Sequence, residues 1–378
     1  MTKRVAGSED NSRASAAPKR SGALTMDLSL ARRMPAEWEK HDATWIAWPH
    51  HEPDWPGKLA PIPWVYAEIV RVLADHDRVE ILCHDATVAD TARTLLGAHG
   101  VKENGYRVHL VSSDRVWLRD SAPTAVVRAD GRVELINWGF NGWAKYDNYK
   151  KDSEIGSEIE RITGLSRIVP TRPDNGERLI LEGGGIEVNG AGLMLVTEEW
   201  LLTPVQVRNP GMLAGDYEKA FTEYLGVSDT IWLGEGAVGD DTHGHVDDIA
   251  RFSSRDTVIL AYEQDPADGN HARSADNLRR LQLAAEKRPL KIVMIPFPRA
   301  VMLNGERLPA SYANFYIANG AVLVPTFNDP ADRVALNGIA EAFPRYTVIG
   351  IHAVDLVWGL GTLHCLTQQQ PSGGAAKR

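Results

Sequence analysis

The sequence contains little cysteine, and this scarcity limits the classes of protein it can encode. Cys83 and Cys365 are the only cysteines in 378 residues, too few for a secreted disulfide framework or a cysteine-rich zinc site. We therefore expect a reducing compartment, the cytoplasm. Cys83 lies in an apolar stretch typical of core packing, whereas Cys365 follows a glycine-rich approach, a setting that favours an accessible thiol. A lone cysteine can be structural or nucleophilic, and these residues alone leave both interpretations open.

The chain also lacks an excess of positive charge and any long hydrophobic run. Its formal net charge is -9, which provides no basic face for nucleic acid, so no nucleic-acid partner is expected. A small cationic substrate fits this charge better. No stretch approaches the roughly 20 apolar residues that cross a bilayer, so no membrane partner is expected. The sequence does not fix the oligomeric state and leaves a homo-oligomer open.

The two ends of the chain differ from its middle in composition. Residues 1–33 are rich in Ser, Ala, Lys and Arg and contain no apolar run, which predicts a disordered extension. Residues 372–378 are small and polar and predict a loose tail. We expect one folded domain over residues 34–371.

Tight hairpin signals recur along this middle part. Asp130-Gly131, Asn189-Gly190 and Asn319-Gly320 are each flanked by apolar or β-branched runs, as type I′ turns require, and a fainter signal lies at residues 254–256. Successive turns are 59, 65 and 65 residues apart. A period of this length indicates repeated supersecondary units.

Between the turns the hydrophobic pattern changes from a helical to a strand period. Four hairpins and about five strand-helix modules fit a closed ring better than an open sheet. We therefore predict an α/β fold, a five-bladed α/β propeller, in which a strand near residues 44–48 completes the blade begun by the C-terminus. The predicted helix and strand pairs are 62–74 with 79–84, 85–99 with 107–112, 215–225 with 230–233, and 331–343 with 347–351.

Such a ring brings equivalent positions of the blades to its axis, so polar residues in apolar strands are the candidates for a site. They lie just before successive hairpins, and Cys365 ends the last strand. The candidates are Asp120, Glu182, His245, Asp247, Ser311, Asn314 and Cys365.

Asp120 follows an apolar strand and has Trp117 beside it in Trp117-Leu118-Arg119-Asp120. A guanidinium pairs bidentately with a carboxylate, so this position can bind one. An ion pair with Arg119 or a turn cap explains Asp120 equally well.

Residues 240–248 form the densest polar cluster in the chain. If they form a strand, His243, His245 and Asp247 point to the same face. That face can perform general acid/base catalysis or bind a metal, and a solvated acidic turn is the third interpretation.

Glu182 interrupts an apolar run directly before three glycines. A buried carboxylate requires a cation or hydrogen-bond donor, which can be a substrate or a structural arginine. The triple glycine lacks the Lys-Ser/Thr ending and the spacing of nucleotide-binding loops, so nucleotide binding is excluded.

Taken together, collinear motifs over residues 34–371 make the chain resemble the agmatine deiminases and Porphyromonas-type peptidylarginine deiminases of the guanidine-modifying (pentein) superfamily. The motifs are Met-Pro-Ala-Glu-Trp-Glu at 34–39, Trp-Leu-Arg-Asp at 117–120, Trp-Gly-Phe-Asn-Gly-Trp at 138–143, Leu-Glu-Gly-Gly at 181–184, Gly-His-Val-Asp at 244–247, Ser-Tyr-Ala-Asn-Phe-Tyr at 311–316 and His-Cys-Leu-Thr-Gln-Gln at 364–369.

The resemblance implies a five-bladed propeller and a hydrolase of linear amidines that uses no metal and no cofactor. Cys365 would be the nucleophile, His245 the general acid and base, and Asp120 and Asp247 the carboxylates that hold the guanidinium. Trp117, Glu182 and Asp241 would also contact the substrate.

The implied reaction converts agmatine to N-carbamoylputrescine and ammonia through a covalent thiouronium, a step of polyamine metabolism. A deiminase of free or peptidyl arginine or another guanidino compound is the alternative, and a metal-dependent hydrolase a further one. A non-catalytic guanidine-binding protein would not need the thiol.

The sequence departs from the family pattern where specificity is set. Residues 359–363 read Gly-Leu-Gly-Thr-Leu where the family usually has Gly-Gly-Gly-Asn-Ile. Asp241 replaces a frequent glutamate that meets the distal amine of agmatine, His243 replaces a common asparagine, and residues 54–58 differ from the usual Asp-Asn-Trp-Arg pattern. The resemblance therefore predicts the reaction class, and these departures concern the identity of the substrate.

Overall fold

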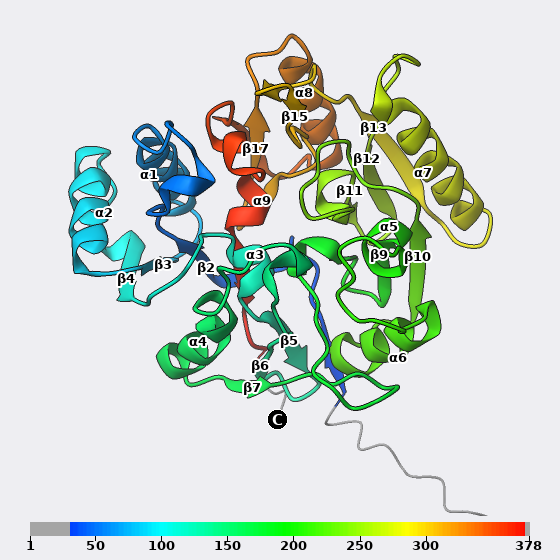
Figure 1. The fold of residues 1–378 in the computed structure, drawn as a ribbon, viewed down its shortest axis with the longest axis horizontal. Helices are drawn as coiled ribbons and strands as arrows, with labels where there is room; N and C mark the ends of the chain where they lie inside the picture. The colour runs from blue at the N-terminus through cyan, green and yellow to red at the C-terminus, as the bar shows by residue number, and fades with distance from the viewer. Residues whose placement is uncertain (1–30, 375–378) are drawn as a thin grey trace, which may run out of the picture.

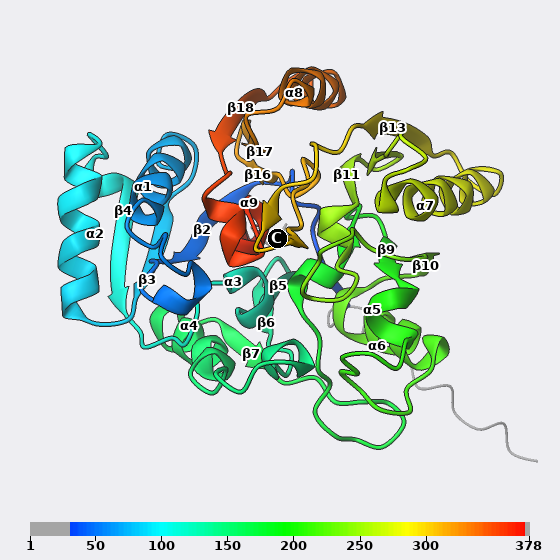
Figure 2. The same ribbon diagram turned by 45° about the horizontal axis from the view of Figure 1, so that its top comes forward.

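Five small mixed sheets arranged around a common centre make up the frame of the protein (Figures 1 and 2). The computed structural model describes residues 31–374. Each sheet joins an antiparallel strand pair to a parallel neighbour, which confirms the predicted five-bladed α/β propeller. The blades consist of β1 (Arg32–Arg33), β5 (Thr124–Arg128), β6 (Val133–Ile136) and β7 (Ser166–Ile168); β8 (Glu187–Val188), β9 (Leu193–Thr197) and β10 (Asp229–Leu233); β11 (Ala250–Ser254), β12 (Thr257–Ala261) and β13 (Lys291–Ile295); β16 (Tyr316–Ala318), β17 (Ala321–Thr326) and β18 (Thr347–His352); and β19 (Gln368–Pro371), β2 (His41–Ala47), β3 (Val79–Cys83) and β4 (Tyr106–Leu110). The separate pair β14 (Met302–Leu303) and β15 (Glu306–Arg307) forms a small ribbon.

Strand β1 corrects the expected start of the folded chain. Most of the extension predicted over residues 1–33 lies outside the described residues, but Arg32 and Arg33 pair with β5. The Arg32 guanidinium also donates to a Glu134 carboxylate oxygen at 2.7 Å. These partners on another strand place Arg32 and Arg33 in a sheet, ahead of the predicted start of the domain at residue 34.

The ring is closed by strands from opposite ends of the chain, as predicted. β19 pairs antiparallel with β2, from Gln368 opposite Trp45 to Pro371 opposite His41. The Trp45 indole N–H also donates to the Gln370 side chain at 3.0 Å. Hydrogen bonds and packing between β19 and β2 therefore close the ring.

All four predicted hairpins are present, but the predicted turn type is wrong. A type I′ turn needs positive φ at both central residues. Only the glycine has it in each pair, with φ of 84° at Gly131, 69° at Gly190 and 85° at Gly320. Asp130 and Asn189 instead accept the backbone N–H two residues further on, which holds them in Asx turns.

The outer helices follow the four predicted ranges closely, but two further outer helices, α4 and α7, had no predicted range. α7 was not predicted because its buried positions are mostly polar and form no apolar stripe; they are Asn270, Ser274, Asn277 and Leu281. Among the described residues, no helix is long and apolar enough to cross a membrane. The helices are α1 (Ile62–Leu73), α2 (Ala86–Ala98), α3 (Leu118–Ser121), α4 (Ile155–Thr163), α5 (Glu198–Leu202), α6 (Ala214–Leu225), α7 (Gly269–Ala285), α8 (Ala331–Ala342) and α9 (Leu363–Leu366).

Candidate active site

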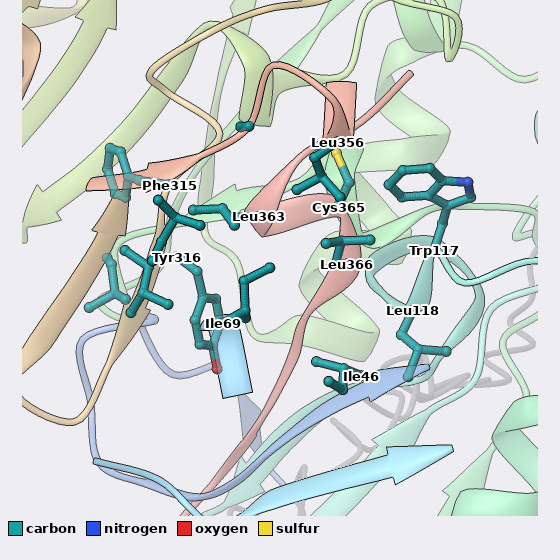
Figure 3. Packing of buried hydrophobic residues seen from close by; sticks show 14 of the residues in the cluster. Ile46, Ile69, Trp117, Leu118, Phe315, Tyr316, Leu356, Leu363, Cys365 and Leu366 are labelled. Carbon is teal, nitrogen blue, oxygen red and sulfur yellow. The ribbon is translucent and has the colours of Figure 1, made fainter. Parts of the chain in front are cut away.

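Cys365 lies on α9, one of two short helices at the centre of the ring (Figure 1). The sequence predicted an accessible thiol at the end of a strand, and the structure corrects both points. The residue is only 7% exposed, because α9 packs into the hydrophobic core. Figure 3 shows Cys365 beside the Trp117 indole, with Leu363 and Leu366 of the same helix packed around it.

A narrow pocket opens onto this thiol. Cys365 and Asp120 are its most buried polar members, and the indoles of Trp117 and Trp143 form apolar walls. The predicted substrate contacts Trp117 and Asp241 both line it. The lining residues are Arg115, Trp117, Asp120, Trp143, Asp241, Thr242, Gly359, Leu360 and Cys365.

Asn314 positions the thiol and the turn that carries it. Its side-chain N–H lies 3.1 Å from Cys365 Sγ. Its side-chain oxygen accepts from the Thr362 hydroxyl at 2.8 Å and from the His364 backbone N–H at 3.0 Å. The sequence marked Asn314 only as a polar residue before a hairpin, and its role became visible from these contacts.

The thiol is neutral in the free protein. Burial raises the pKa of Cys365 well above the usual value, and the carboxylates of Asp247, Asp248 and Asp120 raise it further. Asp247 Oδ2 is 3.8 Å from Sγ. A thiolate at this position therefore requires an additional positive charge nearby.

Asp120, on α3, is held by two donors. The Trp143 indole N–H donates to Oδ2 at 2.9 Å and the Gly184 backbone N–H to Oδ1 at 3.0 Å. Burial raises the pKa of Asp120 to about 6, although the positive charge of His245 opposes the shift. The carboxylate is ionised at neutral pH.

His245 lies between two carboxylates. Its Nδ1 is 3.8 Å from Asp120 Oδ1 and its Nε2 is 3.5 Å from Glu182 Oε2. Burial lowers the pKa of His245, but Asp120 and Glu182 outweigh burial and raise that pKa to about 9. The imidazole is therefore protonated at neutral pH and can donate a proton.

Glu182 was expected to contact substrate, and the structure places it elsewhere. It is fully buried and does not line the pocket. Arg208 donates to its Oε1 at 3.0 Å and the Trp200 indole N–H to its Oε2 at 2.7 Å. Arg208 and the His245 interaction hold the pKa of Glu182 at about 2 despite burial. In the free protein Glu182 therefore interacts with the His245 imidazole and lies outside the pocket lining.

Asp247, in the short 3-10 helix Val246–Asp248, is fully buried. His364 Nδ1 is 2.7 Å from Asp247 Oδ2, and His364 Nε2 is 2.8 Å from Glu37 Oε2. The His364 interaction keeps the pKa of Asp247 below its usual value despite burial. Within the described chain, Asp247 Oδ1 and both ring nitrogens of His245 have no hydrogen-bond partner, so the site presents unsatisfied polar atoms to a ligand.

The triple glycine after Glu182 allows these groups to converge. A methyl group on Gly184 would lie 2.6 Å from His245 Nδ1, 2.9 Å from Asp120 Oδ1 and 3.1 Å from Asp247 Oδ2. A methyl group on Gly185 would lie 2.4 Å from the Trp200 ring. The glycines are thus explained by close packing around the catalytic candidates.

His243 does not join the site. Residues 240–245 form no strand, and His243 adopts φ of 63°, so the alternation assumed from the sequence is absent. Its Nε2 contacts the Thr203 hydroxyl at 3.0 Å, and its Nδ1 lies 3.8 Å from Glu199. The geometric basis of the metal-binding interpretation is therefore wrong.

Residues 33–371 match the model of the Porphyromonas-type peptidyl-arginine deiminase family. The chain belongs to that family. It is 32% identical to the agmatine deiminase of Pseudomonas aeruginosa over 90% of this chain and 95% of that protein, and 34% identical to that of Stutzerimonas stutzeri with the same coverage. The structure of the Enterococcus faecalis agmatine deiminase is similar, with a TM-score of 0.82, 27% identity and coverage of 90% of this chain and 96% of that chain.

One departure from the family pattern now has a structural description. Leu360 of this deiminase-family chain has φ of 70°, a left-handed conformation that favours glycine, and it lines the pocket. On either side, Gly359 and Gly361 let the Trp117 ring approach closely, since added methyl groups would lie 2.9 Å and 2.7 Å from it. The Leu360 side chain therefore narrows the pocket at the cost of a strained backbone.

Proposed function

We propose that this protein hydrolyses the guanidinium group of agmatine to N-carbamoylputrescine and ammonia through a covalent thiouronium on Cys365. The observation that carries the proposal is the convergence of one thiol, one protonated imidazole and two carboxylates. Cys365 and Asp120 line the inner end of the pocket, and the buried Asp247 and His245 lie within 3.8 Å of Cys365 and Asp120, respectively. The agmatine deiminase names of the similar bacterial proteins support agmatine as the substrate.

The substrate brings a positive charge to a site in which the free protein has buried carboxylates around the thiol. Asp120 and Asp247 would each accept N–H groups of the guanidinium, whose planar donors match carboxylates. The apolar face of Trp117 would cover its plane. The positive charge thus introduced next to Cys365 favours the thiolate, and the thiol proton is released to solvent.

Attack and release then follow from the positions of the two acid/base groups. The sulfur attacks the central guanidinium carbon, and His245 protonates the departing nitrogen, which leaves as ammonia. His245, now neutral, takes a proton from water, and the resulting hydroxide adds to the thiouronium carbon. The carbon–sulfur bond breaks as the hydroxyl proton of the adduct passes to the sulfur, which releases the ureido product and restores the thiol.

The cytoplasm is the compartment that we propose for this reaction. Both cysteines are free, and the nucleophile must stay reduced to act.

A substrate panel tests the proposed function. Ammonia release would be measured from agmatine, free arginine and a peptidyl arginine, with the wild type and Cys365→Ala. We expect turnover of agmatine that Cys365→Ala abolishes, while Cys83→Ala, which alters the buried cysteine outside the pocket, retains it. Turnover that survives in Cys365→Ala would contradict the proposal.

A further inference from the structure

The outer end of the pocket is already engaged by a charge of the protein itself. Lys145 Nζ lies 2.5 Å from Asp241 Oδ1, and the Tyr146 hydroxyl donates to Asp241 Oδ2 at 2.7 Å. Both oxygens of this carboxylate therefore have partners before any substrate arrives.

Exposure increases from the inner to the outer end of the pocket. Cys365 and Asp120 are buried, whereas the side chain of Asp241 is 17% exposed and that of Lys145 is 42% exposed. Because Cys365, Asp120 and Asp241 line the same pocket, a guanidinium held at Cys365 directs its tail towards Asp241. In agmatine that tail ends in an ammonium, and Asp241 is the carboxylate that it would meet.

A second cation reinforces the charge of Lys145. Arg115 lines the pocket, with its guanidinium carbon 4.0 Å from the centre of the Tyr146 ring and its ion-pair partner Asp54 at 3.4 Å. Burial raises the pKa of Asp54 to about 7 although Arg115 opposes the shift, so this partner is only partly charged at neutral pH. An additional cation at the outer end is therefore repelled unless one of the resident cations moves away.

We propose that Lys145 is an intramolecular competitor for Asp241 and thereby limits the affinity of the pocket for agmatine, an inference that rests on the proposed function. The agmatine ammonium must displace the Lys145 ammonium, which moves into solvent from its exposed position. A guanidine with an uncharged tail requires no displacement. Lys145 is thus a residue that sets specificity according to the charge of the substrate tail.

A purely structural role of the same ion pair makes the opposite prediction. Lys145 follows three residues with positive φ, Gly142 at 64°, Trp143 at 58° and Ala144 at 54°, and such backbone persists only when its surroundings hold it. If the pair with Asp241 merely fastened this turn, its loss would loosen Trp143, which donates to Asp120. Binding of every guanidine would then weaken.

The two roles are separated by binding measurements in a background that cannot turn over the ligand. Calorimetry with Cys365→Ala would compare agmatine with butylguanidine, which lacks the terminal ammonium. We expect Lys145→Met to tighten agmatine about two- to fivefold, within the range for an exposed ion pair, and to leave butylguanidine unchanged. Lys150→Met, an exposed lysine further along the same segment, is the matched control and should change neither affinity.

A second substitution tests whether the gain depends on Asp241. Adding Asp241→Asn to Lys145→Met should abolish the tightening of agmatine. Unchanged or weaker agmatine binding by Lys145→Met would overturn the inference, and so would a parallel loss of butylguanidine binding. If wild-type protein releases no ammonia from agmatine while Lys145→Met still tightens agmatine alone, the proposed function fails and the inference about Lys145 stands.

Discussion

At the scale of single residues, the most consequential pair is His245 and Asp120. In the proposed mechanism, the imidazole must be protonated to release ammonia, and the carboxylate must be ionised to bind the guanidinium. Their pKa values, about 9 for His245 and about 6 for Asp120, lie on the required sides of neutral pH. The two groups interact, so the observed values will belong to the pair.

We therefore predict a bell-shaped pH dependence of kcat/KM for agmatine. Activity should fall below about pH 6, where Asp120 takes up a proton, and above about pH 9, where His245 loses one. Replacing Glu182 by Gln removes a carboxylate that raises the pKa of His245 and should shift the alkaline limb to lower pH. An alkaline limb that stays in place in Glu182→Gln would contradict the assignment of that limb to His245.

Sequence reasoning identified Asp120, His245, Asp247 and Cys365 as candidates, but it misplaced their local structure. Asp120 and Cys365 were expected at strand ends and lie on four-residue helices, and Asp247 lies in a 3-10 turn. Their apolar neighbours have a strand-like pattern because they pack into the core on all sides. Tertiary contacts therefore determine the local backbone conformation here, and the hydrophobic periodicity of the sequence carries no information about them.

At the scale of elements, α7 shows how a helix can form without an apolar stripe. Asn277 replaces hydrophobic contact with hydrogen bonds: its side-chain oxygen accepts from the Gly234 N–H at 2.7 Å, and its side-chain N–H donates to the Glu235 carbonyl at 2.8 Å. Asn270 similarly accepts from the Val238 N–H. These bonds fix the chain that leads from β10 towards His245, and hydrophobic periodicity cannot reveal them.

The substitution Asn277→Ala should therefore destabilise the fold by about 2 kcal/mol, because it leaves the buried backbone N–H of Gly234 without its acceptor and removes the donor to the part-buried Glu235 carbonyl. Denaturant unfolding would measure the change. Arg279→Ala, on the same helix, removes only an exposed ion pair with Asp276 and should cost less than about 0.5 kcal/mol. Equal effects of the two substitutions would show that Asn277 does not hold this segment.

At the scale of the whole molecule, the ring depends on the pairing of β19 with β2. The same strand secures α3, since Arg119 donates to the side-chain oxygens of Gln368 at 2.8 Å and Gln369 at 2.7 Å. The turn signals and their period were sufficient to predict this closure. The arginine contacts were not predictable, because they join residues about 250 positions apart.

A chain that stops at Thr367 should consequently lose both stability and activity. It lacks all of β19 and both glutamine acceptors of Arg119, which leaves a buried guanidinium without two of its acceptors. A chain that stops at Gly374 retains every described strand and should match the full-length protein in melting temperature and ammonia release. A shortened Thr367 chain that unfolds and reacts like the full-length protein would refute the role of β19 in closure.

The order of the blades also has a consequence for synthesis on the ribosome. β2 is synthesised before β3 and β4 of its blade. Its other partner, β19, follows Cys365 in the chain. The other four blades must therefore be translated before the nucleophile and the strand that seals its blade become available. A growing polypeptide with His245, Asp120 and Asp247 already made is still inert, so a reactive thiol meets its carboxylates only when the whole ring can assemble.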